Sequence, residues 1–184
     1  MVSGGVASRG VEGEDPEMDI ARAFSDGLEE VGGVVHDAVG DLSLAELTAR
    51  PGEGANTIAW LVWHLTRVLD DHLAPAFGHE QRWFVAGWAE RFALPFPPED
   101  DGYGQTADQV AAVRLDATGL LGYFDDVRSH TLAMLDGVDP ARFDERVATP
   151  DGETALGTRL VRTFVDVTQH AGQAAFVRGM VVAR

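Results

Sequence analysis

The sequence contains neither cysteine nor lysine among its 184 residues. A covalent thiol nucleophile and a Schiff-base amine are therefore excluded. Any catalysis must depend on histidines, carboxylates, hydroxyls or a bound group. A chain without cysteine is indifferent to the redox state of its compartment, so this absence does not by itself assign a location.

Positive charge is also scarce. Fourteen arginines stand against 30 acidic residues, which gives a formal net charge of −16. This balance repels phosphate backbones and anionic lipids, so we expect no nucleic-acid or membrane partner and retain small molecules or proteins. No apolar run approaches the roughly 18 residues of a spanning helix, and the first residues lack the apolar segment of a signal peptide. A cytoplasmic protein is expected.

Length and composition favour a single domain. A chain of this size with 45% hydrophobic residues can bury a sizeable core without disulfides. Residues 1–14 are glycine-rich and acidic and show no periodicity, which predicts a flexible N-terminal extension. Residues 15–184 are expected to form the folded domain.

Strand-like alternation is almost absent, and helical periodicity dominates the sequence. We therefore predict an all-α four-helix bundle. Asp15 followed by Pro16, Asn56 or Thr57, and Thr106 are the expected helix starts. The four long helices are expected at about residues 15–39, 57–74, 106–137 and 154–182.

The connections predict the topology of the bundle. A capping box at Ser43 and Glu46 indicates a short helix between the first and second long helices. About thirty residues separate the second helix from the third, enough to return along the whole bundle. This long crossover predicts an up-down-down-up order, in which the second helix runs antiparallel to the fourth. On that arrangement His64 and His170 lie at the same level to within about one helical turn.

Two histidines and a carboxylate form the candidate site. His170 lies on the inward side of the fourth helix, Asp166 shares its stripe, and Gln173 lies one turn away. His64 lies at the border of the apolar side of the second helix. Two imidazoles and one carboxylate can bind a divalent ion and leave positions open, as in catalytic sites. The alternative is that these histidines are hydrogen-bonded core or boundary residues, which is the more common role of a lone helical histidine.

The other polar residues near this site have different expectations. His72 lies eight residues beyond His64, about 12 Å along a helix, so one metal cannot bind both. We interpret His72 as structural, paired with a nearby acid. Asp71 lies close to the His64 stripe and is expected either to hold the second nitrogen of that imidazole or to be an exposed acid. Three further histidines lack a partner at ligand spacing and are expected on the surface: His36, His79 and His130.

The segments WHLTR (residues 63–67) and QHAGQ (residues 169–173) resemble motifs of the DinB-like superfamily of four-helix bundles. The likeness is greatest to actinobacterial members that resemble mycothiol-dependent enzymes, and it covers nearly everything after residue 15. It implies that His64 is a metal ligand, that His170 is the final ligand of the family signature H-x-x-x-H-x-x-Q, and that Gln173, the glutamine of that signature, orients a ligand or the thiol. The first histidine of that signature is replaced by Asp166, which would change metal affinity and preference.

The resemblance also implies an activity. A divalent metal, Zn²⁺ or Ni²⁺, would hold the sulfur of a low-molecular-weight thiol, mycothiol, and stabilise the thiolate for attack on a small electrophile. The aromatic residues of the long connector, Trp83, Trp88 and Phe92, could form a wall of the pocket, or a lid that buries the open side of the bundle. No additional C-terminal domain is expected beyond the fourth helix. Mycothiol-dependent maleylpyruvate isomerases have such a domain, so that activity is disfavoured.

The second functional hypothesis is a non-enzymatic bundle, either a small-ligand binder or a stress-associated homodimer with a degenerate metal site. The family and apolar residues expected at the surface, such as Trp63, favour a homodimer formed through an outer helix face. A di-iron carboxylate bundle is excluded because no glutamate has a histidine three residues later. The segment at residues 102–107 superficially resembles a dinucleotide fingerprint, but no strand precedes it.

Overall fold

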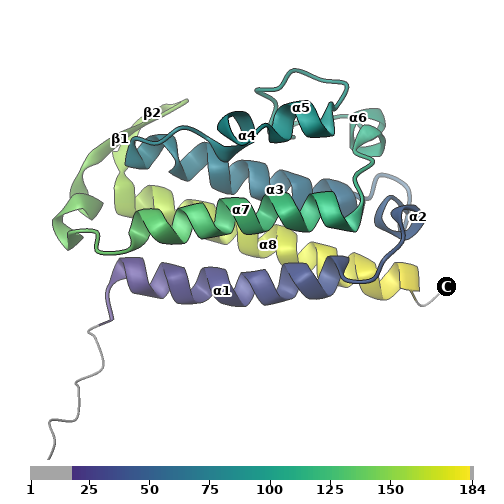
Figure 1. Ribbon diagram of the computed structural model, residues 1–184, viewed down its shortest axis with the longest axis horizontal. Coiled ribbons are helices and arrows are strands. Elements are labelled where there is room, and N and C mark those ends of the chain that lie inside the picture. Colours follow the sequence, from purple (N-terminus) through teal and green to yellow (C-terminus); the bar gives the residue numbers. More distant parts are fainter. Residues whose placement is uncertain (1–17, 183–184) are drawn as a thin grey trace, which may run out of the picture.

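The computed structural model describes residues 18–182 and confirms the all-α prediction. Four long helices pack side by side into a bundle (Figure 1). They are α1 (Ile20–Val39), α3 (Ile58–Leu73), α7 (Ala117–Leu135) and α8 (Leu156–Val182). No helix in the described part of the chain is long and apolar enough to cross a membrane.

The helices follow the predicted up-down-down-up order (Figure 1). α1 and α8 run in one direction, and α3 and α7 run in the opposite direction. α3 packs most extensively against α8, its antiparallel neighbour. The short helix α2 (Leu44–Leu47) links α1 to α3, and its capping box forms as predicted: Ser43 and Glu46 each accept a hydrogen bond from the other's backbone N–H.

The connector between α3 and α7 returns along the full length of the bundle and covers it on one side (Figure 1). Its helical turns are η1 (Pro75–Phe77), α4 (Arg82–Val85), α5 (Trp88–Phe92) and α6 (Ala107–Ala112). This segment forms an additional layer that covers one side of the four-helix bundle. α3 lies beneath that layer.

The prediction of one continuous helix at residues 106–137 is wrong. The capping box at Thr106 and Gln109 does start a helix, but α6 ends after six residues. Val113 then takes an extended conformation, and both Val113 and Leu115 are buried. Asp116 starts α7 by accepting a hydrogen bond from the Gly119 N–H at 2.8 Å. The helical spacing of apolar residues continues through this break in the sequence, because the residues of the break also bury apolar side chains.

Two other boundaries differ from prediction. α1 begins with Asp19, which accepts from the Arg22 N–H at 2.8 Å; the predicted start at Asp15, like the predicted extension at residues 1–14, lies outside the described residues. A turn after Thr149 joins the two strands of an antiparallel hairpin that was not predicted. It consists of β1 (Arg146–Thr149) and β2 (Gly152–Ala155), follows η2 (Pro140–Asp144), and leads directly into α8.

α3 is buried around its whole circumference from Ile58 to Asp70, since the bundle covers one side and the connector covers the other. Trp63 is 0% exposed and packs against Trp83 and Phe96 of the connector, so the expectation that it lies on the surface is wrong. A helix with one predicted apolar stripe thus has no solvent-facing side here.

Asp70 attaches the connector to α3. Its carboxylate accepts hydrogen bonds from the backbone N–H groups of Arg82 and Trp83, at 2.9 and 2.7 Å, and from the Tyr123 hydroxyl at 3.2 Å. Burial raises the pKa of this carboxyl group. The fully buried Arg67 lies 3.9 Å from Asp70 and above the Trp83 ring. These contacts fix the start of α4, and with it the path of the connector.

Candidate metal centre

The structure brings His64, Asp166 and His170 together. Each offers one ligand atom, and these three atoms lie within 4.8 Å of one another. The imidazole rings of His64 and His170 are 4.7 Å apart, centre to centre, and nearly perpendicular. The group forms because antiparallel α3 and α8 place these residues at the same level of the bundle.

His64 is held in the tautomer that a metal ligand needs. Its side chain is buried, and Nδ1 lies 2.5 Å from the backbone carbonyl oxygen of Asp101. A carbonyl oxygen only accepts, so Nδ1 carries the proton and Nε2 keeps its lone pair. Burial, above all other contributions, lowers the pKa of His64 and favours the neutral ring. Trp60 stacks on the ring at 4.7 Å and fixes its plane.

His170 is oriented in a similar way. Its Nδ1 lies 3.1 Å from Gln173 Oε1, and its Nε2 lies 3.7 Å from Asp166 Oδ1. Gln173, which was expected to orient a ligand or the thiol, lies at hydrogen-bond distance from the His170 ring. Asp166 Oδ1 is buried and accepts no hydrogen bond. An orphaned carboxylate oxygen beside two imidazoles is costly, and a divalent cation bound to all three would remove that cost. The residues present therefore fit a metal ion.

A loop at residues 100–105 covers His64, and sequence reasoning missed it. Gly102 has φ +101°, and a Cβ atom there would lie 2.9 Å from His64 Nδ1. Asp100 and Asp101 shape the loop by accepting hydrogen bonds from the N–H groups of Gly102 and Tyr103. The Asp-Asp-Gly sequence is a turn signal that indicates such a loop, but it does not say which histidine the loop contacts.

Side-chain contacts fix this loop to α3. Trp60 Nε1 donates to Gln105 Oε1 at 2.7 Å, and Gln105 Nε2 donates to Asp100 Oδ2 at 3.1 Å. The residue that stacks on His64 therefore also holds the loop whose carbonyl accepts from His64. The imidazole is constrained on its face and at its Nδ1 atom.

A pocket of about 480 Å³ opens beside the triad. It is lined by His64, Val68, His72, Glu99, Asp100, Asp101, Tyr103, Pro150 and Asp166. His72 lies two helical turns from His64, and its Nδ1 is 3.2 Å from the Thr163 hydroxyl, which replaces the predicted acidic partner. Burial first, and Arg159 second, lower the pKa of His72. His72 is thus a pocket residue, although spacing had assigned it only a structural role.

Asp71 does not contact His64. Its Oδ1 accepts a hydrogen bond from Gln81 Nε2 at 2.9 Å and lies 4.0 Å from the Arg67 guanidinium. The partner of the His64 ring is instead a backbone carbonyl from the connector. The Asp101 carbonyl occupies the position that was one of the two expectations for Asp71, because the tertiary path of residues 100–105 could not be inferred from helix periodicity.

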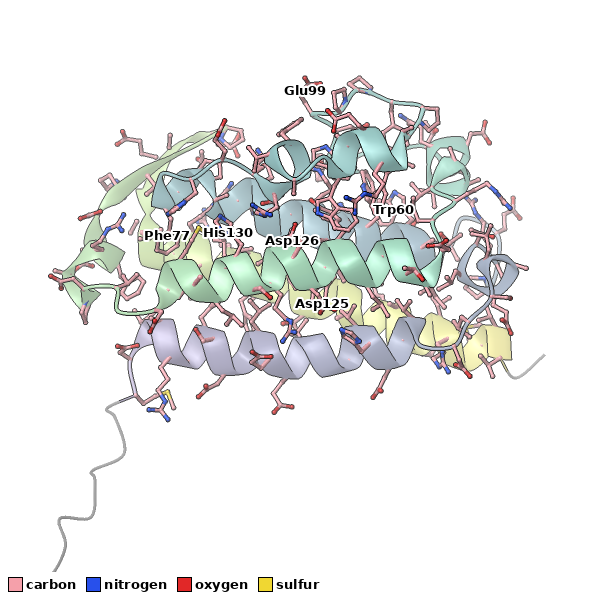
Figure 2. All side chains as sticks on the ribbon, viewed as in Figure 1. Trp60, Phe77, Glu99, Asp125, Asp126 and His130 are labelled. Carbon is pink, nitrogen blue, oxygen red and sulfur yellow. The ribbon has the colours of Figure 1, made fainter. Side chains whose placement is uncertain are left out.

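The aromatic residues of the connector do not line this pocket. Trp83, Trp88 and Phe92 pack around Tyr123 of α7, with ring centres 5.2 to 5.8 Å from its ring. Trp88 Nε1 also donates to Asp126 at 2.7 Å; Figure 2 shows Asp126 on α7. They form the lid over the bundle that was the alternative to a pocket wall.

The three remaining histidines form no group with two further ligands among residues 18–182. His36 lies on the surface, 2.9 Å from Asp125. His79 is exposed, as predicted for a surface residue, whereas His130 is half-buried. The two rings are edge-on to each other, with their centres 5.3 Å apart. Figure 2 shows Asp125 and His130 at separate positions along α7.

Comparisons with known proteins agree with this fold. A DinB superfamily profile matches residues 28–174. A conserved protein from Enterococcus faecalis superposes with a TM-score of 0.82 at 23% identity, covering 91% of this chain and 100% of the other. YfiT from Bacillus subtilis, described as a probable metal-dependent hydrolase with an unusual four-helix bundle topology, gives 0.56 at 17% identity, covering 96% and 93%. None of the curated proteins matches the sequence significantly.

Proposed function

Since this chain belongs to the DinB superfamily, we propose that it binds one divalent metal ion, Zn²⁺ or Ni²⁺, through His64, Asp166 and His170. The observation that carries the proposal is the buried Oδ1 of Asp166, which accepts no hydrogen bond from the described residues and lies 3.7 Å from His170 Nε2. Asp101 and Gln173 hold the two rings by their Nδ1 atoms, so both Nε2 atoms are available to the ion.

The reaction we propose takes place in the cytoplasm and is attack of a low-molecular-weight thiol, such as mycothiol, on a small electrophile. The thiol loses its proton, its sulfur forms a bond to the electrophilic carbon, and the leaving group of the electrophile departs with the electron pair of the broken bond. Three protein ligands leave one coordination position of the cation open. A thiol bound to the cation at that position would have a lowered pKa. The chain has no cysteine, so the sulfur must come from the co-substrate. His72, a pocket residue about two helical turns from His64, would contact the part of the substrate that is remote from the sulfur.

A hydrolase is the competing enzymatic proposal, because water can take the same open position. The description of YfiT as a probable metal-dependent hydrolase favours it. Turnover in the presence and absence of added thiol separates the two reactions. A bundle that binds metal but turns over neither substrate class would support the non-enzymatic hypothesis.

Metal analysis of protein purified without an affinity tag tests the metal site. We expect about one equivalent of Zn²⁺ or Ni²⁺ in the wild-type protein and at least a roughly tenfold loss of affinity in His170→Ala, because one of three ligands is removed. His36→Ala is the matched control, since the His36 side chain is exposed and its Nε2 lies 2.9 Å from Asp125, which is not part of the triad. His170→Gln, checked for helicity by circular dichroism, separates ligand loss from unfolding. Wild-type protein that binds no stoichiometric metal would contradict the proposal.

We also propose that the protein forms a homodimer through the outer face of α8. This 27-residue helix contains one acidic residue, Asp166, in a chain with 30. Arg162 is its one exposed charged residue within the described part. The outer face instead presents apolar side chains: Val161, Val165, Phe176, Met180 and Val182. Two chains that each carry a net charge of −16 repel each other. This repulsion is weakest where the facing surfaces contain few acidic residues, as on the outer face of α8.

A further inference from the structure

The charge of the pocket beside the triad is unusual. Three carboxylates line its outer part, Glu99, Asp100 and Asp101, and no arginine lines it. Arg159 lies nearby, but its Nε donates to the backbone carbonyl of His72. We call Glu99, Asp100 and Asp101 the acidic rim. Figure 2 shows Glu99 projecting from the connector at the edge of the molecule.

The hydrogen bonds of the acidic rim leave part of it available to a ligand. Both oxygens of Asp100 are engaged, by Gly102 N–H and by Gln105 Nε2. Asp101 Oδ1 accepts from Tyr103 N–H, which leaves its Oδ2. Glu99 is exposed and makes no hydrogen bond or ion pair within residues 18–182. A ligand in the pocket therefore meets the free oxygens of Glu99 and Asp101.

The end of the pocket beside the triad also presents a buried polar atom, Asp166 Oδ1, that has no hydrogen-bond partner in the described residues. The His64 side chain lines the pocket and is 6% exposed, and its Nε2 has no hydrogen-bond partner in the described chain. A metal at this end, together with Asp166, would carry one net positive charge. The acidic rim carries three negative charges, so the pocket as a whole stays negative even when a dication is bound.

We propose that the pocket selects a substrate with a positively charged amine, and that Glu99 and Asp101 bind its ammonium group while the reacting atom faces the triad. This inference rests on the proposed function for the position of the reacting end. Substrates that carry a carboxylate or phosphate are rejected by the acidic rim. The pocket volume of about 480 Å³ lies within the range of small-ligand sites.

Three small thiols, each with two methylene groups between the sulfur and the polar group, test the proposal: cysteamine (cationic), 2-mercaptoethanol (neutral) and 3-mercaptopropionate (anionic). Their dissociation constants are measured on Co²⁺-loaded protein from the absorption band that sulfur ligation produces. We expect cysteamine to bind at least about tenfold more tightly than 3-mercaptopropionate. The acidities of the three thiols differ, so the decisive quantity is the change of this ratio between the wild type and a variant.

The variant is Glu99→Gln with Asp101→Asn, in which the asparagine oxygen can still accept from Tyr103 N–H. We expect the ratio to fall at least about fivefold, since two of the three rim charges are removed. The control, Glu30→Gln with Glu53→Gln, removes the same charge from exposed positions that do not line the pocket. It should keep the wild-type ratio.

The outcomes separate the two proposals. If Co²⁺ binds but the ratio is unchanged in the rim variant, the ammonium site is wrong and the metal proposal stands. If Co²⁺ does not bind, the metal proposal fails. The acidic rim is then tested on metal-free protein by nuclear magnetic resonance. The chemical shifts of the Trp60 indole and the His72 ring are followed as ethylammonium or propionate is added. Shifts caused by ethylammonium alone and lost in the rim variant support the acidic rim; no such shifts overturn it.

Discussion

Among single residues, the candidate site depends on how each imidazole is held as much as on which residues are present. His64 contacts Trp60 on its face, the Asp101 carbonyl at Nδ1 and the Gly102 backbone beside that atom. His170 has Gln173 at its Nδ1. These contacts leave both Nε2 atoms for a common ligand, so the residues around the triad determine its geometry.

Gly102 is the residue whose replacement should affect His64 most directly. In Gly102→Ala the new methyl group would lie 2.9 Å from His64 Nδ1, 3.0 Å from Trp63 and 3.1 Å from Trp60, at a positive φ. We expect a stability loss of about 2–4 kcal/mol, from backbone strain and displacement of the ring, together with weaker metal binding. Urea denaturation and metal titration measure the two effects.

Gly104→Ala is the matched control for this substitution. Gly104 also has a positive φ, +72°, but a Cβ atom there meets no atom within 4 Å. The Gly104→Ala variant should lose only about 1–2 kcal/mol of its free energy of unfolding, because of the unfavourable backbone conformation, and should bind metal normally. Equal metal affinity in the two variants would show that the loop does not position His64.

Among the helices, the packing of α1 against α8 depends on a glycine. An alanine Cβ at Gly27 would lie 2.6 Å from the tip of the Phe164 ring, which also packs against Phe24 at 5.5 Å. The three glycines of α1 weaken it as an isolated helix. Gly27 is nevertheless required, because the Phe164 ring occupies the space that a side chain would need.

Substitutions at two glycines of α1 should therefore have opposite signs. Gly33 is exposed, and a methyl group added there would meet no atom within 4 Å, so Gly33→Ala should stabilise the protein by about 0.5–1 kcal/mol through helix propensity. Gly27→Ala should destabilise it by about 1–2 kcal/mol because overpacking exceeds that gain. Thermal unfolding measures both, and in a Phe164→Leu background the Gly27 penalty should shrink. A stabilising Gly27→Ala would contradict the packing argument.

Over the molecule as a whole, the distribution of charge separates two functions of α8. Its inner side contributes Asp166 and His170 to the candidate metal centre, and its outer side carries apolar residues in a strongly acidic chain. The acids are concentrated on the other elements, including the acidic rim at residues 99–101. Dimerisation through α8 would leave the acidic rim free, since that rim belongs to the connector.

Phe176 is the most exposed apolar side chain of this outer face, at 70%. We expect the wild-type protein to sediment as a dimer of 19.7 kDa chains and Phe176→Glu to sediment as a monomer, because the new charges would repel each other across the interface. Val85→Glu, at an exposed position of α4, should remain dimeric. A monomeric wild-type protein at about 100 μM, well above the dissociation constant of a stable dimer, would contradict the proposed interface.

The elements and their order follow largely from the sequence alone. Capping residues at Ser43, Thr57 and Thr106 mark helix starts correctly, because a cap is a local interaction between a side chain and the next turn. The long connector predicted the up-down-down-up order, because parallel neighbours require a long return. That order then placed His64 and His170 at one level, and the helical stripe shared with His170 indicated Asp166 as the third member.

The surroundings of these residues, in contrast, depend on the tertiary fold. Trp63 is buried, Asp101 replaces Asp71 as the partner of His64, and His72 lines the pocket, all because the connector folds over α3. Helical periodicity reports one apolar side of a helix and contains no information about a second covering layer. The path of that layer is set by long-range contacts such as those of Asp70, which join residues far apart in sequence and leave no periodic signal.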